Sequence, residues 1–249
     1  MNPTRRVAIV TGGTRGIGAA VTRRLAEEGT HVCAVFHSAG TSADALRDEL
    51  VAQGRSVSLH QGDVGERAFC RALVEEVVAT HGRVDHLVNN AGRLVENNAV
   101  RMTEQEWDDA VRVNLSGPFH LAQAVLPAMI EQRFGRIVNV GSVTAAMGSA
   151  VEVGYGAAKA GLLGLTRSLA RAVARKGITV NLVVPGVYDT DMTAAMRPEA
   201  QEAIRAMIPL GRRGEPGELA HAVAFLLDDR AGYVTGSVVT VDGGLSMGG

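Results

Sequence analysis

Lysine is nearly absent from this chain: Lys159 and Lys176 are its only lysines, although lysine and arginine together number 25. Arginine therefore supplies almost all of the positive charge. A guanidinium stays protonated and binds through a rigid planar fork, whereas an ammonium is a compact cation with rotatable donors. The two are not interchangeable at a site built around a point charge. Lys159, four residues after Tyr155, is therefore a candidate for a chemical role.

Cysteine is equally rare, with only Cys33 and Cys70 in 249 residues. Two cysteines cannot build a disulfide framework, and neither has the sequence spacing of a metal site, so we expect two buried thiols and no metal. The chain also lacks a run of 18 or more apolar residues, so no membrane helix is expected. The first strand-like run begins at residue 7, which leaves no room for a signal peptide and favours the cytoplasm. A net charge of -1 provides no basic face for nucleic acid.

What the chain does contain is an alternation of short apolar runs with amphipathic stretches. The apolar runs cover residues 7–10, 32–36, 57–59, 86–88, 137–140, 180–184 and 238–241. Runs that are apolar on successive residues suit strands covered on both faces, so the pattern predicts an α/β fold with a parallel sheet between two helical layers. No linker or repeat interrupts it, and we expect one domain over residues 1–249. Ligands of such sheets bind beyond the carboxyl ends of the strands.

A glycine-rich turn follows the first apolar run. Gly12, Gly16 and Gly18 lie in it, and residues 19–28 then read as a helix that ends at Gly29. Such glycines let the backbone approach a pyrophosphate, while the helix N-terminus supplies unpaired N–H donors and positive potential. A tight strand-to-helix turn also needs glycine for steric reasons alone. The turn by itself leaves both interpretations open.

Tyr155 and Lys159 carry the most specific chemical signal. At i and i+4 of a helix their side chains project from one face, where the ammonium favours the ionised phenol. An unperturbed phenol has a pKa of ~10. The pair therefore predicts a lowered pKa for Tyr155 and a tyrosine that acts as an acid near neutral pH.

Several motifs occur together along the chain. They are Thr11-Gly12-Gly13-Thr14-Arg15-Gly16-Ile17-Gly18, Asn89-Asn90-Ala91-Gly92, Ser142 with Tyr155 and Lys159, and Pro185-Gly186. In this combination the chain resembles the short-chain dehydrogenase/reductase family over essentially its whole length. Residues 135–142, 158–162 and 177–181 are similar to bacterial 3-oxoacyl-carrier-protein reductases. The resemblance implies a single-domain Rossmann fold with a doubly wound, mostly parallel seven-stranded sheet, and a homotetramer.

The resemblance also implies the catalytic roles. Tyr155 would be the general acid that protonates a carbonyl oxygen, and Ser142 would hydrogen-bond and orient that oxygen. Lys159 would lower the pKa of Tyr155 and hold the nicotinamide ribose. Asn114 resembles the family asparagine that distorts a helix to seat a relay water, although a mid-helix asparagine is often only a local back-bonding residue.

The family positions that contact the cofactor also occur here. They are Gly12, Thr14, Arg15, Gly16, Ile17, Gly18, His37, Ser38, Asp63, Val64, Asn90, Ala91, Gly92, Tyr155, Lys159, Pro185, Gly186, Tyr188 and Thr190. Asp63 could equally cap the next helix, and Asn89 is as much a structural candidate as a ligand. Tyr188 stands where close relatives usually have an aliphatic residue.

The end of the second strand indicates which dinucleotide binds. An NAD enzyme is expected to place an acid there to accept the ribose hydroxyls. The chain has Phe36-His37-Ser38 instead, and Arg15 with His37 and Ser38 can donate to a 2′-phosphate. We therefore expect NADPH/NADP+ as the cofactor.

The substrate is less clearly specified. Residues 93–98, 143–151 and 187–210, with Met192, Met196 and Met207, would line a mainly apolar pocket, although methionines are often plain packing. Arg133 and Lys176 match positions that present charge to an acidic acyl carrier protein, or they are simply solvated. We expect NADPH-dependent reduction of a 3-oxoacyl thioester.

Two alternatives remain open. Arg93 follows the Asn-Asn-Ala-Gly motif, as in some aromatic-polyketide ketoreductases, so a polyketide or other secondary-metabolite substrate is the first alternative. A non-catalytic NADP-binding regulator is a remote one, because the four catalytic positions Asn114, Ser142, Tyr155 and Lys159 are all present.

Overall fold

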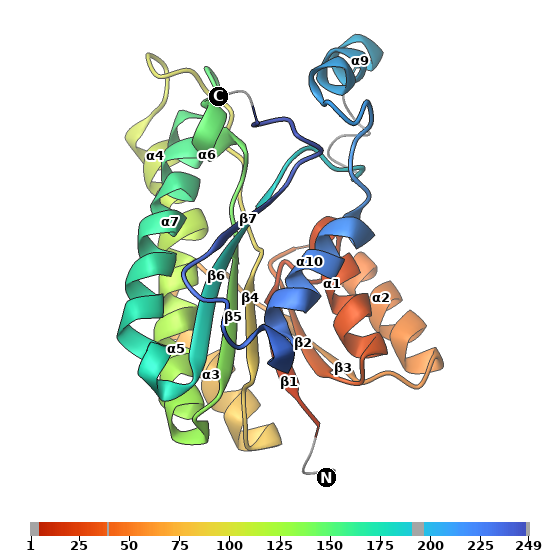
Figure 1. Cartoon of the computed structure of the whole chain (residues 1–249), viewed down its shortest axis with the longest axis vertical. Helices are drawn as coiled ribbons and strands as arrows, with labels where there is room; N and C mark the ends of the chain where they lie inside the picture. The colour runs from red at the N-terminus through yellow and green to blue at the C-terminus, as the bar shows by residue number, and fades with distance from the viewer. Residues whose placement is uncertain (1–4, 39, 191–196, 248–249) are drawn as a thin grey trace.

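A seven-stranded parallel sheet forms the centre of the molecule (Figure 1). The computed structural model describes residues 5–38, 40–190 and 197–247. The strands are β1 (Val7–Thr11), β2 (His31–Phe36), β3 (Val57–Gln61), β4 (His86–Asn89), β5 (Gly135–Val140), β6 (Ile178–Pro185) and β7 (Val238–Val241). Their order across the sheet is β3-β2-β1-β4-β5-β6-β7. The change of direction at β1 and β4 creates the crevice in which such sheets bind ligands.

Helices cover both faces of this sheet. The described ones are α1 (Gly16–Glu27), α2 (Gly40–Ala52), α3 (Arg67–His81), α4 (Glu104–Val111), α5 (Gly117–Gln132), α6 (Thr144–Met147), α7 (Val153–Val173), α9 (Pro198–Met207) and α10 (Pro216–Leu227). A π-helical segment, η1 (Arg112–Ser116), joins α4 to α5, and two 3-10 segments are η2 (Ala174–Lys176) and η3 (Asp229–Ala231). None of these helices is long and apolar enough to cross a membrane.

Two hydrophobic cores result from the alternation of side chains along each strand. Val7 and Ile9 of β1 face the layer of α3, α5 and α7, whereas Ala8 and Val10 face α1, α2 and α10. The two helical layers are seen on opposite sides of the sheet in Figure 1. The free cysteines Cys33 and Cys70 are both buried in the first of these cores.

The structure confirms all seven predicted strands, with differences of a few residues at their ends. The first helix begins three residues earlier than predicted, at Gly16 instead of Ala19. Arg15 has an extended backbone, with φ -148° and ψ 162°, so the chain turns directly after it. Gly16, Ile17 and Gly18 therefore form the first turn of α1.

An ion cluster closes the amino-terminal edge of the sheet. The Asp85 side chain is fully buried, and it accepts hydrogen bonds from Arg6 Nη1 (2.9 Å), Arg83 Nη2 (2.6 Å) and the Val7 amide (2.9 Å). Burial alone would raise the pKa of Asp85, but the donors from Arg83, Val7 and Arg6 outweigh it and hold the pKa below its usual range.

Replacing Asp85 with Ala should destabilise the fold by about 3 kcal/mol, since three donors lose their acceptor. A carboxylate with a lowered folded pKa stabilises the fold above its unfolded pKa of ~3.9 and loses that contribution as the pH falls through the folded value. The difference in urea unfolding between wild type and D85A should therefore shrink in acid. The exposed Asp44, which pairs with Arg47, is the control, and an equal loss in D44A would contradict the prediction.

Candidate functional site

The glycine-rich turn connects the carboxyl end of β1 to α1. Gly12 and Gly16 have φ values of 60° and 51°, in the region that side chains disfavour. A Cβ on Gly18 would overlap the carbonyl oxygen of Gly12. Arg15, the residue that precedes α1, makes no side-chain cap to the helix. The first amides of α1 are thus left for another acceptor, and the turn suits the pyrophosphate of a dinucleotide.

Hydrogen bonds join this turn to the Asn-Asn-Ala-Gly segment after β4. Thr11 Oγ1 accepts from the amides of Asn90 (3.0 Å) and Ala91 (2.9 Å), and Asn90 Nδ2 donates to the Thr11 carbonyl (2.9 Å). Asn89 points into the interior, where its Nδ2 donates to Asn139 Oδ1 (2.8 Å). Asn89 is therefore structural, and the Asn90 side chain supports the turn.

Ser142, Tyr155 and Lys159 meet at the carboxyl end of β5. Tyr155 and Lys159 are one turn apart on α7, as predicted. The Lys159 side chain is buried, its Nζ donates to the Val140 carbonyl (2.8 Å), and Nζ lies 5.7 Å from the centre of the Tyr155 ring. The Ser142 hydroxyl is close enough to the Tyr155 phenol to lower the pKa of that phenol. Two hydroxyl groups and an ammonium are thereby gathered at the edge of the sheet where ligands bind.

The pKa of Tyr155 differs from the sequence-based prediction. Burial raises it above the ordinary value, and the Glu152 carboxylate also raises it, while the nearby Ser142 hydroxyl only partly compensates. Lys159 is not among the groups that shift this pKa, so the predicted lowering is not found. Burial also lowers the pKa of the Lys159 ammonium to about 8. Tyr155 therefore stays protonated at neutral pH, which is the form that a proton donor requires.

Asn114 lies inside the π-helical segment η1, which confirms the predicted distortion of a helix at this residue. A π turn shifts the hydrogen bonds from i-4 to i-5, so one carbonyl loses its partner. Asn114 Nδ2 donates to the carbonyls of Ala110 (2.9 Å) and Arg93 (2.9 Å). Its Oδ1 accepts from the Arg93 amide (3.2 Å). The side chain thus fixes the start of the loop that follows Gly92.

Gly92 lies next to the side chains of both Asn114 and Lys159. A Cβ on this glycine would lie 3.0 Å from Asn114 Oδ1 and 3.6 Å from Lys159 Nζ. Asn114, Lys159, Ser142 and Tyr155, which span residues 114–159, therefore occupy one continuous region.

The end of β2 lies beside the glycine-rich turn because the Gly13 amide donates to the Val35 carbonyl (3.0 Å). Arg15, His37 and Ser38 are all exposed there. Within the described part of the chain, the Arg15 guanidinium makes no ion pair, whereas most other arginines are paired with carboxylates. A free guanidinium next to two side chains that can donate suits a phosphate group.

Asp63 and Val64 have other partners. Asp63 accepts from Arg112 Nη1 (2.8 Å) and the Gly65 amide (2.8 Å), and Val64 is buried in the core. Glu66, not Asp63, is the residue that precedes α3. Because both side chains are occupied, the main chain of these residues remains for the predicted contact with an adenine. The Asp63 carboxylate does not cap α3 as predicted but stabilises a turn through the Gly65 amide.

The segment after β6 combines structural and site residues. Gly186 packs on the last strand, since a Cβ there would lie 2.7 Å from Asp242 Cα. Thr190 faces the glycine-rich turn, with its Cγ2 only 3.5 Å from where a Cβ on Gly16 would be. The Tyr188 side chain is buried and its hydroxyl donates to the Val241 carbonyl (2.7 Å). Tyr188 is therefore directed away from the other predicted cofactor residues.

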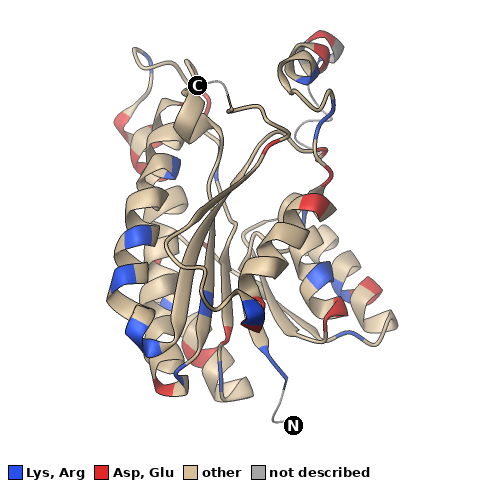
Figure 2. Cartoon of the chain, in the orientation of Figure 1, with Lys and Arg blue, Asp and Glu red and all other residues tan. Residues whose placement is uncertain are grey.

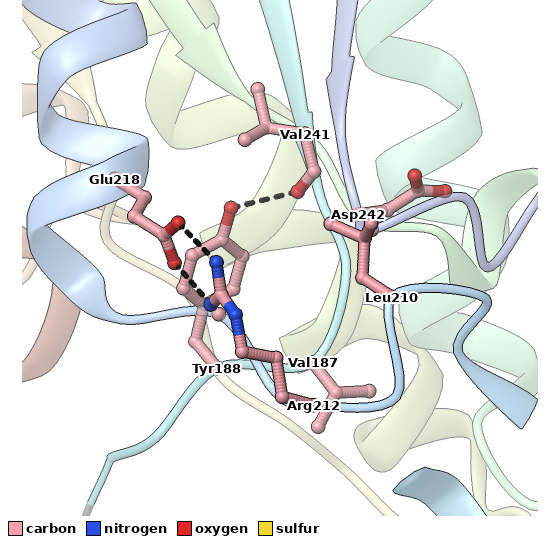
Figure 3. Close-up of a pocket in the computed structure, with 9 residues that line it drawn as sticks. Val187, Tyr188, Leu210, Arg212, Glu218, Val241 and Asp242 are labelled. Carbon is pink, nitrogen blue, oxygen red and sulfur yellow. Dashed lines mark hydrogen bonds and ion pairs between the residues drawn. The ribbon is translucent and has the colours of Figure 1, made fainter. Parts of the chain in front are cut away.

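Figure 3 shows the cavity next to Tyr188, of about 90 Å³. Arg212 closes one side through a two-pronged pair with Glu218, at 2.7 and 2.8 Å. The cavity is lined by Val187, Tyr188, Leu210, Arg212, Gly214, Glu218, Val241, Asp242 and Gly243. None of the four predicted catalytic residues lines this cavity. The cavity is therefore part of the packing that supports the segment after β6.

Two of the three segments predicted to hold the substrate adjoin each other. The Asn97 amide donates to the Val151 carbonyl (2.8 Å), and Asn97 forms a parallel bridge with Glu152. Arg93 pairs with Asp109 at 3.1 Å. In the third segment, Met207 is 58% exposed at the end of α9, whereas Met192 and Met196 lie outside the described residues.

A sequence profile of the family described as Enoyl-(Acyl carrier protein) reductase matches residues 12–246. Together with the arrangement above, this match decides the family. The chain belongs to the short-chain dehydrogenase/reductase family. Its sheet order is that of a Rossmann-like α/β fold, and its homologues are oxidoreductases that act on CH-OH groups.

Curated relatives of this family match nearly the whole chain. The chain is 44% identical to the 3-oxoacyl-(acyl-carrier-protein) reductase FabG of Escherichia coli over 247 residues, which cover 99% of this chain and 100% of that protein. The protein of the same name from Vibrio cholerae gives the same identity and coverage. That of Staphylococcus aureus is 43% identical over 240 residues, which cover 96% of this chain and 98% of that protein.

The sequence-based analysis missed the polar network behind the predicted catalytic residues. Asn139 Nδ2 donates to Thr166 Oγ1 (2.9 Å), and Asn139 in turn accepts from Asn89. This network links β4, β5 and α7 beneath the short-chain dehydrogenase/reductase site. A polar Asn139 within the apolar run of β5 was the available signal, because a buried amide must find partners.

Proposed function

We propose that this protein reduces the 3-oxo group of an acyl thioester to a 3-hydroxy group with NADPH as the hydride donor. The observation that carries the proposal is the Ser142 hydroxyl beside the Tyr155 phenol, next to a buried Lys159. The names of the curated relatives support the substrate class.

The chain's own residues fit the proton-transfer half of this reaction. Ser142 would donate to the substrate carbonyl oxygen and orient it between the two hydroxyl groups. Tyr155, protonated at neutral pH because burial raises its pKa, would deliver the proton to that oxygen. Lys159, whose pKa of about 8 leaves it mostly charged, opposes the developing negative charge. Asn114 would hold the π turn and the Gly92 loop against Lys159.

The residues of the glycine-rich turn fit a dinucleotide. The uncapped start of α1 would receive the pyrophosphate, and Thr190 and the main chain after Pro185 would lie along the nicotinamide end. When bound, NADPH supplies the hydride.

Arg15 should select NADPH over NADH. A charged hydrogen bond of about 1.5–3 kcal/mol to the 2′-phosphate corresponds to about 10- to 100-fold in affinity. Steady-state kinetics of R15A should show that fall in kcat/KM for NADPH and little change for NADH. Arg24, on the same helix but paired with Glu28 at 2.7 Å, is the control. Equal values of kcat/KM for the two cofactors in wild type would contradict an NADPH enzyme.

One surface of the protein carries positive charge, which suits a substrate bound to an acidic carrier protein. Lysine and arginine gather along α7 toward its carboxyl end (Figure 2), where Arg167 and Arg171 are exposed. Arg133 and Lys176 are also exposed, and a Cβ on Gly177 would overlap the carbonyl oxygen of Arg133. Basic side chains assembled from two helix ends in this way would attract an acidic acyl carrier protein.

Polyketide reduction is the second candidate, because Arg93 stands at the start of the substrate loop and pairs with Asp109. NADPH oxidation should be measured with acetoacetyl-CoA and, separately, with trans-1-decalone, a bicyclic ketone. We expect the thioester to give the higher kcat/KM. Preference for the bicyclic ketone would favour a cyclic polyketide, and no turnover of either despite tight NADPH binding would favour a regulator.

Assembly and location complete the proposal. We propose a homotetramer of chains that each form one domain. Large apolar side chains on α5, α10 and β7 are exposed and would be covered by other subunits, among them Phe119, Phe225 and Val238. The two free, buried thiols suit a reducing compartment such as the cytoplasm.

A further inference from the structure

A cluster of histidines lies at the opposite end of β2 from the proposed NADPH site. His31 opens β2, and Cys33 lies two residues later on the same face. His81 is the last residue of α3, the helix that packs on this face. One side-chain donor atom from each of these three residues lies within 4.8 Å of the other two.

We propose that His31, Cys33 and His81 bind a divalent transition-metal cation, with Zn²⁺ as the best match. Two imidazoles and a thiolate are ligands that Zn²⁺ prefers. Tetrahedral Zn²⁺, with bonds of about 2.0 Å to nitrogen and 2.3 Å to sulfur, needs donor atoms about 3.3–3.6 Å apart. Rotation of the half-buried His81 at the helix end would close the remaining distance.

Neighbouring side chains already hold the ligands in position. His31 Nδ1 lies 2.7 Å from Ser56 Oγ, and His31 Nε2 lies 3.2 Å from Ser58 Oγ. The shorter bond would fix the proton on Nδ1, which leaves the Nε2 lone pair for a metal. The rings of His31 and His81 lie with their centres 4.1 Å apart and their planes tilted by 37°. These contacts order the site before any ion binds.

The protonation states also suit a cation. Burial, with smaller effects from His81, Arg5 and His60, lowers the pKa of His31 to about 4, and burial lowers the pKa of His81 as well. Both imidazoles are thus neutral at pH 7. Burial raises the pKa of Cys33 to about 11, so its thiol would release one proton to solvent as the metal–sulfur bond forms.

Two further residues can complete the coordination. His60 Nε2 lies 2.9 Å from Ser58 Oγ, the hydroxyl that also contacts His31. His60 itself faces the exposed Glu76 across 3.7 Å. A water molecule or His60 would supply the fourth ligand from this solvent side. The bound ion would tie α3 to β2, far from the reacting groups, and would stabilise the fold without entering the reaction.

The linear sequence does not reveal this site, because His31 and Cys33 are two residues apart whereas His81 follows Cys33 by 48 residues. Cys33 was therefore predicted to be only a buried thiol. Antiparallel packing of α3 on β2 sets the end of the helix beside the start of the strand, which brings His81 to His31 and Cys33.

Titration of the untagged protein with Co²⁺ tests the thiolate ligand directly. Cobalt bound to Cys33 should give a near-ultraviolet thiolate-to-cobalt charge-transfer band and the visible bands of tetrahedral Co²⁺, both removed by excess Zn²⁺. C33A should lose the charge-transfer band, whereas C70A, which removes the other buried thiol, should keep it. Absence of the band in wild type, or its persistence in C33A, would overturn the proposal.

A second variant serves if C33A does not fold. H81N changes a half-buried residue at a helix end and should lower the Zn²⁺ affinity measured by calorimetry by more than tenfold. Zn²⁺ should raise the unfolding temperature of wild type, and should do so less in H81N at the same concentration. Equal affinity in the two proteins would assign the ion to another place and reject the site.

Discussion

Replacing Tyr155 with Phe is expected to lower kcat about 10²- to 10⁴-fold, the usual contribution of a positioned general acid. The variant keeps the aromatic ring beside Lys159 and loses only the hydroxyl group near Ser142. NADPH affinity, measured by fluorescence titration, should stay largely unchanged. The defect should therefore appear in kcat while binding is preserved.

Tyr233 provides the matched control, since its side chain is fully exposed at 104% of the reference area. Y233F should behave as wild type in both kinetics and NADPH binding. Appreciable turnover by Y155F would reject Tyr155 as the proton donor. A loss of NADPH binding in Y155F would instead assign the hydroxyl to the cofactor, and the fall in kcat would then carry no information about proton transfer.

Replacing Gly18 with Ala is expected to abolish tight NADPH binding. The new Cβ would overlap the Gly12 carbonyl oxygen and lie 2.6 Å from Asn90 Nδ2, and both atoms belong to the framework of the glycine-rich turn. Relief of the overlap must open the turn at a cost of about 1–3 kcal/mol or more. If that cost falls on the bound conformation, the Kd for NADPH rises about 10- to 100-fold or more.

Gly164 is the matched control for this substitution. It lies within α7, and a Cβ there would meet no atom within 4 Å. G164A should stabilise the fold by about 0.5–1 kcal/mol, because alanine favours a helix more than glycine does. Both variants should be compared by circular dichroism and fluorescence titration. Wild-type NADPH affinity in a folded G18A would contradict the assignment of the turn.

Local pattern was enough to predict the elements but not their interior contacts. Runs such as 137–140 are apolar at almost every position, so they had to be strands covered on both faces, and all seven were found. The predicted start of α1 was three residues too late. The turn ends at Arg15 because its backbone is extended, and amino-acid composition does not reveal a backbone conformation. Asn114 could be placed in a distorted helix only through the family resemblance.

The chemical surroundings of the site residues were harder to predict. The Tyr155–Lys159 spacing gave the shared face of α7, yet it said nothing of burial, and burial is what raises the pKa of the phenol. Tyr188 carried the motif position of a cofactor residue, but its hydroxyl bonds to Val241, 53 residues away. A pKa or a side-chain direction depends on neighbours that only tertiary packing supplies.

By itself the sequence determined the wound parallel sheet, the glycine-rich turn, and which residues are available for proton transfer and phosphate binding. These follow from periodicity and from residue types that few other roles require. The tertiary structure alone decided that Asn114, Gly92 and Lys159 converge, that Asp63 pairs with Arg112, and that His31, Cys33 and His81 form one cluster. The physical reason is the same each time: contacts between residues distant in the chain arise from the packing of helices on the sheet, and linear spacing does not encode them.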